Sequence, residues 1–260
     1  ALFQSYGRFV NTLGGRYITT EDVGTTTQDM EHISTQTTHV VGLPKSLGGS
    51  DDPSYATSIG VFEGIRASLK WALGNSSLNG KHVTIQGFGK VAYHLARQLK
   101  EDGAELTVSD IDPEKMEQAK TEFSATTVSP NEVYDVPCDI FAPCALGNVI
   151  NDVTIQRLQC AIVAGCANNQ LSDDVQAERL AYRGILYAPD YVINAGGVIN
   201  LSFEKLGYNE ERALRRTREI GETLQEVFAT AKKEGIDTAK AANLIAENRL
   251  AKAREEKNGR

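Results

Sequence analysis

The sequence predicts an α/β protein with a doubly wound parallel sheet, an incomplete N-terminal α/β domain and added C-terminal helices. Three observations predict it. The β-branched run His82–Gln86 breaks into glycines and continues as an amphipathic helix. Strand and helix patterns then alternate along the chain, which is typical of a parallel sheet with helices on both faces. The first 13 residues have an amphipathic helical pattern without a cap. Together they indicate a Rossmann-type sheet that follows a shorter N-terminal domain.

The glycine turn has the form Gly-x-Gly-x-x-Ala over residues 87–92. Gly87 permits a tight strand-to-helix turn, Gly89 has no Cβ to hold a diphosphate away from the backbone, and Ala92 lets the helix lie close to the sheet. A diphosphate there would accept hydrogen bonds from free N–H groups at the helix start. Glycines at such a position also occur as turn chemistry alone, so the residues that follow decide between the two interpretations.

Asp110 favours the dinucleotide. It ends the predicted strand Glu105–Ser109, which follows the predicted helix Val91–Lys100. An acid about 20 residues past the glycines can accept hydrogen bonds from both hydroxyls of an adenosine ribose, and its charge repels a 2′-phosphate. The sequence therefore predicts NAD rather than NADP as the cofactor. Asp110 is also a candidate N-cap of the next helix, and the two roles are compatible.

The composition is that of an ordinary globular protein, with 41% hydrophobic and 23% charged residues. The net charge of −7 and the scatter of Lys and Arg argue against a nucleic-acid partner, because phosphate binding needs concentrated positive charge. No stretch is long and apolar enough to span a bilayer, and the N-terminus has no signal-peptide pattern. We therefore expect no membrane association and a cytoplasmic location.

The four cysteines lie on or beside predicted core strands without Cys-x-x-Cys spacing, at Cys138, Cys144, Cys160 and Cys166. For all of them except Cys144, free, buried thiols in a reducing compartment are the expected state. The four histidines form no pair at helical spacing, so no metal site is predicted.

The N-terminal region opens with an apolar helical face, formed by Leu2, Phe3, Tyr6, Phe9, Val10 and Leu13. Because no initiator methionine or cap precedes it, we expect the sequence to begin inside a longer protein. Residues 16–20 are predicted to form a strand, and residues 21–26 a polar turn into a helix that carries Met30 and Ile33. Asp22 in this turn is either a cap or turn residue or, in a cleft, a general base.

Residues 41–53 form a glycine- and proline-rich connection between two domains. The helix predicted at residues 55–73 turns Ile59, Phe62, Ile65 and Leu69 inward, and its paired glycines, Gly60 and Gly64, let another backbone approach. The expected domains are residues 1–50, residues 51–235, and a C-terminal helix over residues 236–260 that packs back on the first domain.

Beyond Asp110, helices are predicted at residues 114–123, 152–158 and 172–183, and strands at residues 139–142 and 161–164. Successive strands deliver small or amide-bearing loops at their carboxyl ends, where open α/β sheets bind ligands. Asn168, Asn169 and Asn194 in these loops either pair with a carboxamide or a carboxylate, or serve as turn residues. Residues 200–207 and 210–260 are predicted to be helical and highly charged, with residues 254–260 frayed.

Five blocks, over residues 16–26, 86–91, 142–147, 167–171 and 188–197, resemble the leucine/valine/phenylalanine branch of the amino-acid dehydrogenases related to glutamate dehydrogenase. The resemblance covers essentially the whole chain and is more specific for the family than for the substrate. It implies NAD-linked, reversible oxidative deamination of an apolar L-amino acid, branched-chain aliphatic or aromatic, to a 2-oxo acid and ammonia. The reaction takes place between a substrate domain, of which residues 1–50 remain, and a Rossmann domain. A homo-oligomer is expected for the full-length protein.

The resemblance also implies roles for individual residues. Asp22 matches the catalytic acid that exchanges protons with the amino group and the attacking water, and Asn169 matches a residue that orients the substrate carboxylate. Thr20, Val198 and Leu201 match an apolar pocket for the substrate side chain, where a second carboxylate would be unpaired and costly. The cofactor contacts comprise the glycine turn, the ribose-binding acid and the nicotinamide side, which are Thr57, Gly87, Phe88, Gly89, Lys90, Val91, Asp110, Cys144, Ala145, Asn168 and Asn194.

The sequence departs from the family upstream of the first helix. Members carry there a glycine-rich stretch with a catalytic lysine and a second lysine that binds the substrate carboxylate, within ~90 residues by family analogy. Loss of the catalytic amine would lower turnover on the order of 100-fold or more. Lys45 is a conceivable replacement, although family spacing does not place a lysine there. The chain is therefore a fragment of a longer enzyme, or a catalytically silent NAD-binding homologue or subunit. An enzyme of the same fold that reduces imines with NADH is a third alternative.

Overall fold

The structure, a computed structural model, describes residues 1–22 and 24–258. Val23, which belongs to the first of the five blocks, lies outside the described residues, as do the last two residues of the segment expected to fray. Residues 254–258 of that segment continue the last helix, α12 (Thr238–Asn258), because this stretch is rich in strong helix formers.

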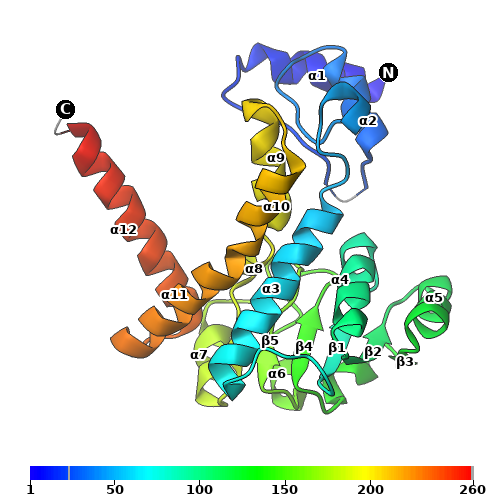
Figure 1. The fold of residues 1–260 in the computed structure, drawn as a ribbon, viewed down its shortest axis with the longest axis vertical. Helices are drawn as coiled ribbons and strands as arrows, with labels where there is room; N and C mark the ends of the chain where they lie inside the picture. Colours follow the sequence, from blue (N-terminus) through cyan, green and yellow to red (C-terminus); the bar gives the residue numbers. More distant parts are fainter. Residues whose placement is uncertain (23, 259–260) are drawn as a thin grey trace.

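The sheet has six strands, which are β1 (His82–Gln86), β2 (Glu105–Ser109), β3 (Thr126–Thr127), β4 (Ile140–Pro143), β5 (Ile162–Val163) and β6 (Leu186–Tyr187). They are parallel and lie in the order β3-β2-β1-β4-β5-β6 (Figure 1). The chain builds one half from β1 outward to β3 and then the other from β4 outward to β6. The predicted doubly wound sheet is thus confirmed, and the order reverses between β1 and β4, the point at which such sheets bind ligands.

Alternate strand residues serve two separate cores. Ile140, Ala142 and Ile162 belong to the larger core, under α3 (Ser54–Leu73), α4 (Lys90–Glu101), α5 (Pro113–Phe123) and α11 (Ile220–Glu234). Phe141 and Val163 point to the other face, toward η2 (Glu132–Asp135), α6 (Thr154–Arg157) and α7 (Val175–Tyr182). Both faces are covered, which explains why the strands read as continuous apolar runs.

Helix α3 carries the close contacts that its two glycines predict. A Cβ on Gly64 would lie 2.5 Å from Cγ1 of Ile193, in α8 (Asp190–Ile193), and one on Gly60 would lie 2.6 Å from Cδ1 of Ile220. Three of its four predicted inward residues are buried, and Phe62 is partly buried. The helix therefore lies closely against both α8 and α11.

The N-terminal region has a small core of its own. Helices α1 (Leu2–Thr12) and α2 (Thr27–Ser34) pack together, and Met30, Ile33 and Val40 are buried between them. The apolar face expected for α1 is only partly covered, because Leu2 and Phe9 are 76% and 62% exposed. The strand predicted at residues 16–20 was wrong. Only Thr19 pairs, with Val40, because the partner segment turns away at Gly42, whose φ is +79°.

The C-terminal residues form α9 (Gly196–Ser202), η3 (Phe203–Leu206), α10 (Glu210–Arg218), α11 and α12. Helix α12 packs against α11 and β6, and its far end projects from the body (Figure 1). The bonds to the N-terminal region come instead from η3, where Glu204 Oε1 accepts hydrogen bonds from the N–H groups of Gly42 and Ser50, both at 2.9 Å. This differs from the expectation that residues 236–260 pack on the first domain.

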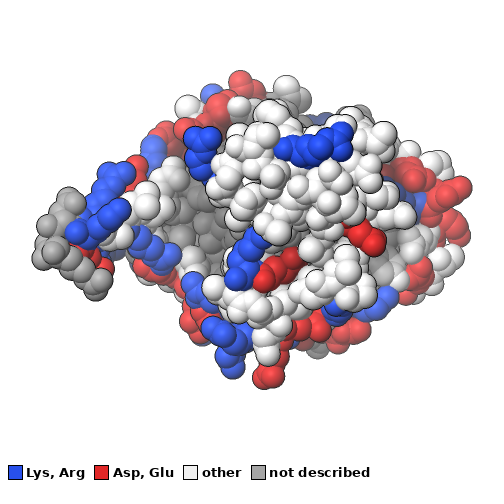
Figure 2. All heavy atoms as spheres, turned by 90° about the horizontal axis from the view of Figure 1, so that it is seen from above, with Lys and Arg blue, Asp and Glu red and all other residues white. Residues whose placement is uncertain are grey.

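Two further features concern the surface. Among the described residues, no helix is both long enough and apolar enough to cross a bilayer. On the face seen from above, positive and negative side chains are interspersed around a broad uncharged area (Figure 2). That face therefore presents no continuous field of one sign.

Candidate active site

A cleft of about 850 Å³ lies at the carboxyl ends of β1 and β4, where the strand order reverses. One side, called here the sheet wall, consists of residues 88–94, 115, 118, 144–145 and 166–168. The other, called the N-terminal wall, consists of residues 21, 22, 24, 25, 52–54 and 57. The volume lies near the upper end of the range for small-molecule sites, about 300–1,000 Å³. Nine predicted site residues line the cleft: Asp22, Thr57, Phe88, Gly89, Lys90, Val91, Cys144, Ala145 and Asn168.

The glycine turn has the shape that an anionic ligand needs. Gly87 has a φ of +91°, and a Cβ there would lie 2.5 Å from the Cβ of Ala145, so this glycine serves both the turn and the packing of the next loop. Around the Cβ position of Gly89 there is open space. Gly89 is also the N-cap residue of α4. Because it has no side chain, it cannot itself bond to the N–H groups of the first turn. The N–H groups of the first turn can therefore face an anion, so these residues fit a diphosphate.

Asp110 is held at the tip of β2 by two backbone amides. Its Oδ2 accepts a hydrogen bond from the N–H of Phe88 at 2.6 Å, and its Oδ1 accepts one from the N–H of Asp112 at 2.9 Å. The N-cap of α5 is Asp112, whose side chain accepts from the N–H of Glu114 at 2.9 Å. The capping role considered for Asp110 was therefore wrong. Its predicted ribose contact stays a prediction, and its position beside the glycine turn fits that role.

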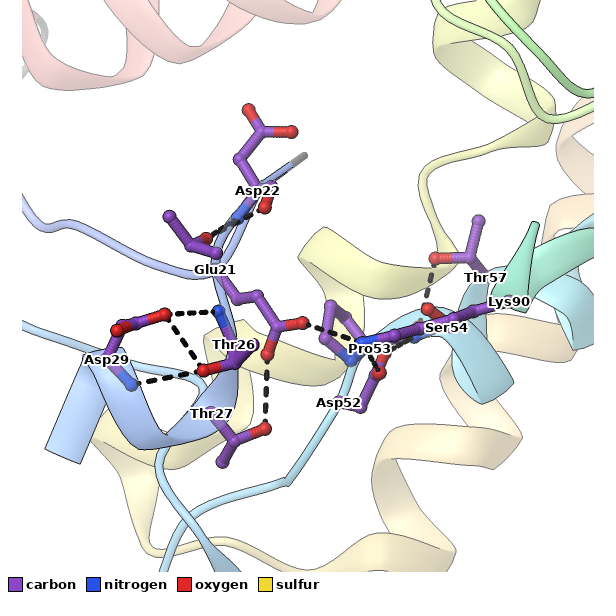
Figure 3. A network of polar contacts seen from close by, with 11 residues as sticks. Glu21, Asp22, Thr26, Thr27, Asp29, Asp52, Pro53, Ser54, Thr57 and Lys90 are labelled. Atoms are coloured by element: carbon purple, nitrogen blue, oxygen red, sulfur yellow. Dashed lines mark hydrogen bonds and ion pairs between the residues drawn. The ribbon is translucent and has the colours of Figure 1, made fainter.

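Lys90 joins the two walls. Its Nζ lies 2.6 Å from Oδ2 of Asp52 and 3.2 Å from Oε1 of Glu21 (Figure 3). Glu21 is only 7% exposed at its side chain and also accepts a hydrogen bond from Thr27 at 3.1 Å. Burial alone would raise the pKa of Asp52, but hydrogen bonds from Lys90 and Ser54 outweigh it and lower that pKa. The hydrogen bond to Asp52 raises the pKa of Lys90.

Asp22 follows Glu21 directly, and the two side chains point in opposite directions (Figure 3). Thr25 fixes the backbone here, since its Oγ1 accepts from the N–H of Asp22 at 2.9 Å and donates to the Asp22 carbonyl at 2.7 Å. Asp22 lines the cleft and also an adjoining cavity of about 430 Å³, which has mainly apolar residues. This turn therefore places a carboxylate where a polar cleft meets an apolar cavity.

The residues predicted to contact the substrate side chain are only partly brought together. Thr20 lines the adjoining cavity, and its buried Oγ1 makes no hydrogen bond within the described part of the chain. A Cβ on Gly42 would lie 2.9 Å from that oxygen and 3.4 Å from Cδ2 of Leu201, so Thr20 and Leu201 flank one backbone position. Val198 lies on α9 and is 72% exposed. The apolar pocket predicted from these three residues stays a prediction.

Hydrogen bonds fix the asparagines at the strand ends. Asn194 donates from Nδ2 to Oδ1 of Asn168 at 2.6 Å and to the carbonyl of Cys166 at 3.2 Å. Asn169, whose φ is +51°, accepts a hydrogen bond at its carbonyl from the N–H of Asn148 at 2.7 Å. Asn194 therefore positions the side chain of Asn168 in the cleft. This role comes in addition to the cofactor contact predicted for Asn194.

The comparisons with known proteins agree with this geometry. Residues 48–258 match the family described as Glutamate/Leucine/Phenylalanine/Valine dehydrogenase. The chain belongs to this family. It is 49% identical over 250 residues to a leucine dehydrogenase from Geobacillus stearothermophilus, covering 96% of this chain and 68% of that protein. It is 46% identical over 257 residues to an L-tryptophan dehydrogenase from Nostoc punctiforme, covering 98% of this chain and 72% of that protein.

Solved structures show the same fold. The crystal structure of L-tryptophan dehydrogenase from Nostoc punctiforme superposes with a TM-score of 0.84 at 45% identity, covering 98% of this chain and 73% of that one. A hetero-hexameric glutamate dehydrogenase from Thermus thermophilus gives a TM-score of 0.79 at 22% identity, covering 97% and 68%, and supports the fold alone. The chain is thus an amino-acid dehydrogenase of the leucine/valine/phenylalanine branch, an oxidoreductase, and the resemblance is confirmed.

Sequence reasoning missed the acids that pair with Lys90 in this dehydrogenase. A lysine in the first turn of a helix is disfavoured by the helix dipole, which is the local signal that acidic partners must lie nearby. It also missed Asp190, a buried acid that accepts a hydrogen bond from the N–H of Gln170 at 2.7 Å and so fixes the loop that carries Asn168. The sequence feature that could have identified Asp190 is its place directly after Pro189, at the end of β6.

Lys45 does not take the place of the family lysines in the cleft. Its Nζ pairs with Oε1 of Glu210 at 3.0 Å, and both side chains are more than half exposed. The lysines that line the cleft are Lys90 and Lys115. In the described part of the dehydrogenase, no three His, Cys, Asp or Glu side chains are grouped to hold a metal ion.

Proposed function

We propose that this dehydrogenase catalyses the NAD-dependent, reversible oxidative deamination of an apolar L-amino acid, branched-chain aliphatic or aromatic, to its 2-oxo acid and ammonia. One observation carries the proposal: Asp22 on the N-terminal wall and the glycine turn on the sheet wall line the same cleft. When bound, NAD supplies the acceptor for the hydride that leaves the substrate α-carbon. The chain's own residues bind both molecules and move the protons.

The sheet wall would hold the cofactor. The N–H groups around Gly89, Lys90 and Val91 would bind the diphosphate at the start of α4. Asp110 would accept the ribose hydroxyls with a carboxylate that Phe88 and Asp112 already orient. A 2′-phosphate would bring a second anion to this carboxylate, which supports NAD over NADP.

The nicotinamide side would be completed by loops that also line the cleft. Residues 144 and 145 directly follow β4, and Asn168, held by Asn194, follows β5. Thr57 lies opposite them at the start of α3, and a Cβ on Gly197 would lie 2.6 Å from its Oγ1. These contacts support a site in which the reactive ring faces the N-terminal wall.

The N-terminal wall would act on the substrate. Asp22 would take a proton from the substrate ammonium and exchange protons with the attacking water. Asn169 would orient the substrate carboxylate, and Thr20, Val198 and Leu201 would contact its side chain. Identities of 45–50% to leucine dehydrogenases and of 46% to an L-tryptophan dehydrogenase support an apolar substrate of either the branched-chain aliphatic or the aromatic class. A homo-oligomer is also proposed, as the family resemblance implies, and the cytoplasmic location stays a prediction.

A substrate and cofactor panel on the full-length protein tests the proposal. The kcat/KM for L-leucine with NAD is expected to exceed that for L-glutamate by at least ~100-fold, because a second carboxylate would be buried without a partner. NAD is expected to be preferred over NADP. A preference for NADP or for glutamate would contradict the proposal, and no turnover with any amino acid would end it.

A further inference from the structure

The four cysteines form two pairs across neighbouring strands. Strands β4 and β5 pair residues that are 22 positions apart, as in Ile140 with Ile162. The cysteines have the same separation in sequence, Cys138 with Cys160 and Cys144 with Cys166. One pair therefore lies at the amino ends of these two strands and the other at their carboxyl ends, in the cleft.

The carboxyl-end pair is brought into contact by a bulge. The N–H of Ala164 donates to the Phe141 carbonyl at 3.0 Å, but the next ladder bond comes from Ala167, one residue later than regular pairing requires, to Pro143 at 2.9 Å. Gly165 makes this possible, since a Cβ there would overlap the backbone of Pro143. The thiol of Cys166 turns back toward Cys144, with its Sγ 3.9 Å from the Cys144 carbonyl oxygen.

The contact between the two thiols lowers the pKa of Cys144, because the Cys166 thiol can donate to a Cys144 thiolate, and for the same reason the pKa of Cys166 is raised well above its usual value. Between the two, Cys144 is therefore the thiol that ionises first. The sulfur of Cys166 lies within 3.9 Å of the backbone of Cys144, which is within the reach of a disulfide.

The amino-end pair differs in its surroundings. Burial raises the pKa of Cys160 to about 12 and also raises the pKa of Cys138. Both side chains pack against the core under η2, α6 and α7. At neutral pH these thiols remain protonated and therefore unreactive. The molecule thus contains its own matched control.

We propose that Cys144 and Cys166 are a modification site at which hydrogen peroxide forms a reversible disulfide on the sheet wall of the cleft. The Cys144 thiolate attacks one peroxide oxygen, so that an S–O bond forms, the O–O bond breaks and the leaving hydroxide takes up a proton to become water. The Cys166 sulfur then attacks the Cys144 sulfur, an S–S bond forms, the S–O bond breaks, and a second water leaves with the Cys166 proton. Two thiols are oxidised by two electrons and one peroxide is reduced to two waters.

The disulfide would tie together two loops that line the cleft. Ala145 follows Cys144, and Asn168 lies two residues beyond Cys166, so the new bond restrains both. The effect on cofactor affinity rests on the proposed function, whereas formation of the bond does not. NADH bound in the cleft should in turn cover the thiols and slow their oxidation.

The first experiment treats the full-length protein with hydrogen peroxide and measures intact mass and cysteine-linked peptides. We expect a loss of two hydrogen atoms, one peptide pair linked between Cys144 and Cys166, and restoration by dithiothreitol. C138S should still form the link, and C144S and C166S should lose it. Absence of the link, or a link between Cys138 and Cys160 formed at an equal rate, would overturn the proposal.

A second measurement identifies the attacking sulfur. C166S should accumulate a sulfenic acid at Cys144, detected by a cyclic dione probe, and C144S should accumulate none at Cys166. Labelling of Cys166 in C144S at the same rate would contradict the assignment. The disulfide is expected to form more slowly with saturating NADH. If it forms at equal rates with and without NADH, the cofactor does not cover this pair of cysteines, although the modification site itself stands.

Discussion

The two walls of the cleft are built in different ways. The sheet wall grows from parallel strands whose backbones pair residue by residue, such as Ile85 with Val108 and Ala142. The N-terminal region, which carries residues 21–25 of the other wall, has one isolated bridge among its described residues, between Thr19 and Val40, and side chains such as Glu204 and Lys90 tie it to the rest of the chain. The position of the first wall is therefore distributed over many hydrogen bonds, whereas that of the second depends on a few.

The largest expected effect belongs to the N-terminal wall. Asp22→Asn removes the proton acceptor while keeping the shape of the side chain, so kcat should fall about 10²- to 10⁴-fold. NAD affinity, measured by titration of the full-length protein, should stay the same, because the proposed cofactor contacts do not include Asp22 and, apart from Thr57, lie outside its wall. Glu31→Gln, an exposed change on α2, is the matched control. A kcat within a few-fold of the parent would remove Asp22 from the chemistry.

The sheet wall can be tested by two glycines with opposite requirements. Gly87→Ala forces an L-residue to a φ of +91° and into Ala145, so unfolding free energy should drop by about 2–3 kcal/mol. Gly89→Ala meets open space and should unfold normally, yet weaken NAD binding at least ~10-fold by obstructing the diphosphate. Denaturant unfolding and NAD titration separate the two. If Gly87→Ala and Gly89→Ala lowered the unfolding free energy equally, the positive φ of Gly87 would not be a source of strain for alanine.

Two links between the η3–α10 region and the N-terminal region should differ in how much they contribute to the free energy of unfolding. Glu204→Ala leaves the N–H groups of Gly42 and Ser50 without their acceptor and should cost about 1–3 kcal/mol. Lys45→Ala removes only an exposed ion pair with Glu210 and should cost no more than ~0.5 kcal/mol. Limited proteolysis within residues 42–50 is expected to accelerate in the first variant alone. Similar behaviour of the two variants would show that Glu204 is not the main tie.

The smallest effect concerns the ion pair that spans the cleft. Asp52 has a lowered pKa in the folded protein, so its pairing with Lys90 stabilises above the ordinary carboxyl pKa and is lost as pH falls through the lowered value. The stability difference between parent and Lys90→Met should be at most ~1 kcal/mol at neutral pH, since the pair is partly exposed, and should vanish in acid. Lys115→Met is the control. A difference that grows as pH falls would contradict this assignment.

Local sequence patterns predicted the sheet wall well. The β-branched runs, the glycine turn and the alternation of strands and helices placed β1, β2, α4 and α5 to within a residue, because each element is set by neighbours in sequence. Asp110 was placed correctly at the end of β2 for the same reason. The error over its capping role arose because two acids, Asp110 and Asp112, stand two residues apart before the same helix.

The N-terminal wall was predicted less well, because its contacts join distant parts of the chain. The bond from Ser50 to Glu204 spans 154 residues and the pair of Lys90 with Asp52 spans 38, so no periodic pattern marks either. Asp22 itself stood out only through family resemblance, since an acid after a short strand is usually a turn residue. The contact of Cys166 with Cys144 was hidden in the same way, because it depends on a bulge at Gly165.

The contacts of η3 determine how the cleft can widen. The polypeptide passes from the N-terminal region to α3 at residues 50–54, where Glu204 holds Ser50, and Lys205 holds the carbonyl of Thr38 at 2.5 Å a short way off. Glu204 also holds Gly42, so several ties of the N-terminal region come from η3, and a rotation about η3 would stretch these ties least. Such a rotation would require the pair of Lys90 with Glu21 to separate. The N-terminal region would therefore rotate about η3 as a rigid unit. Asp22 would move with it, away from the sheet wall of the cleft.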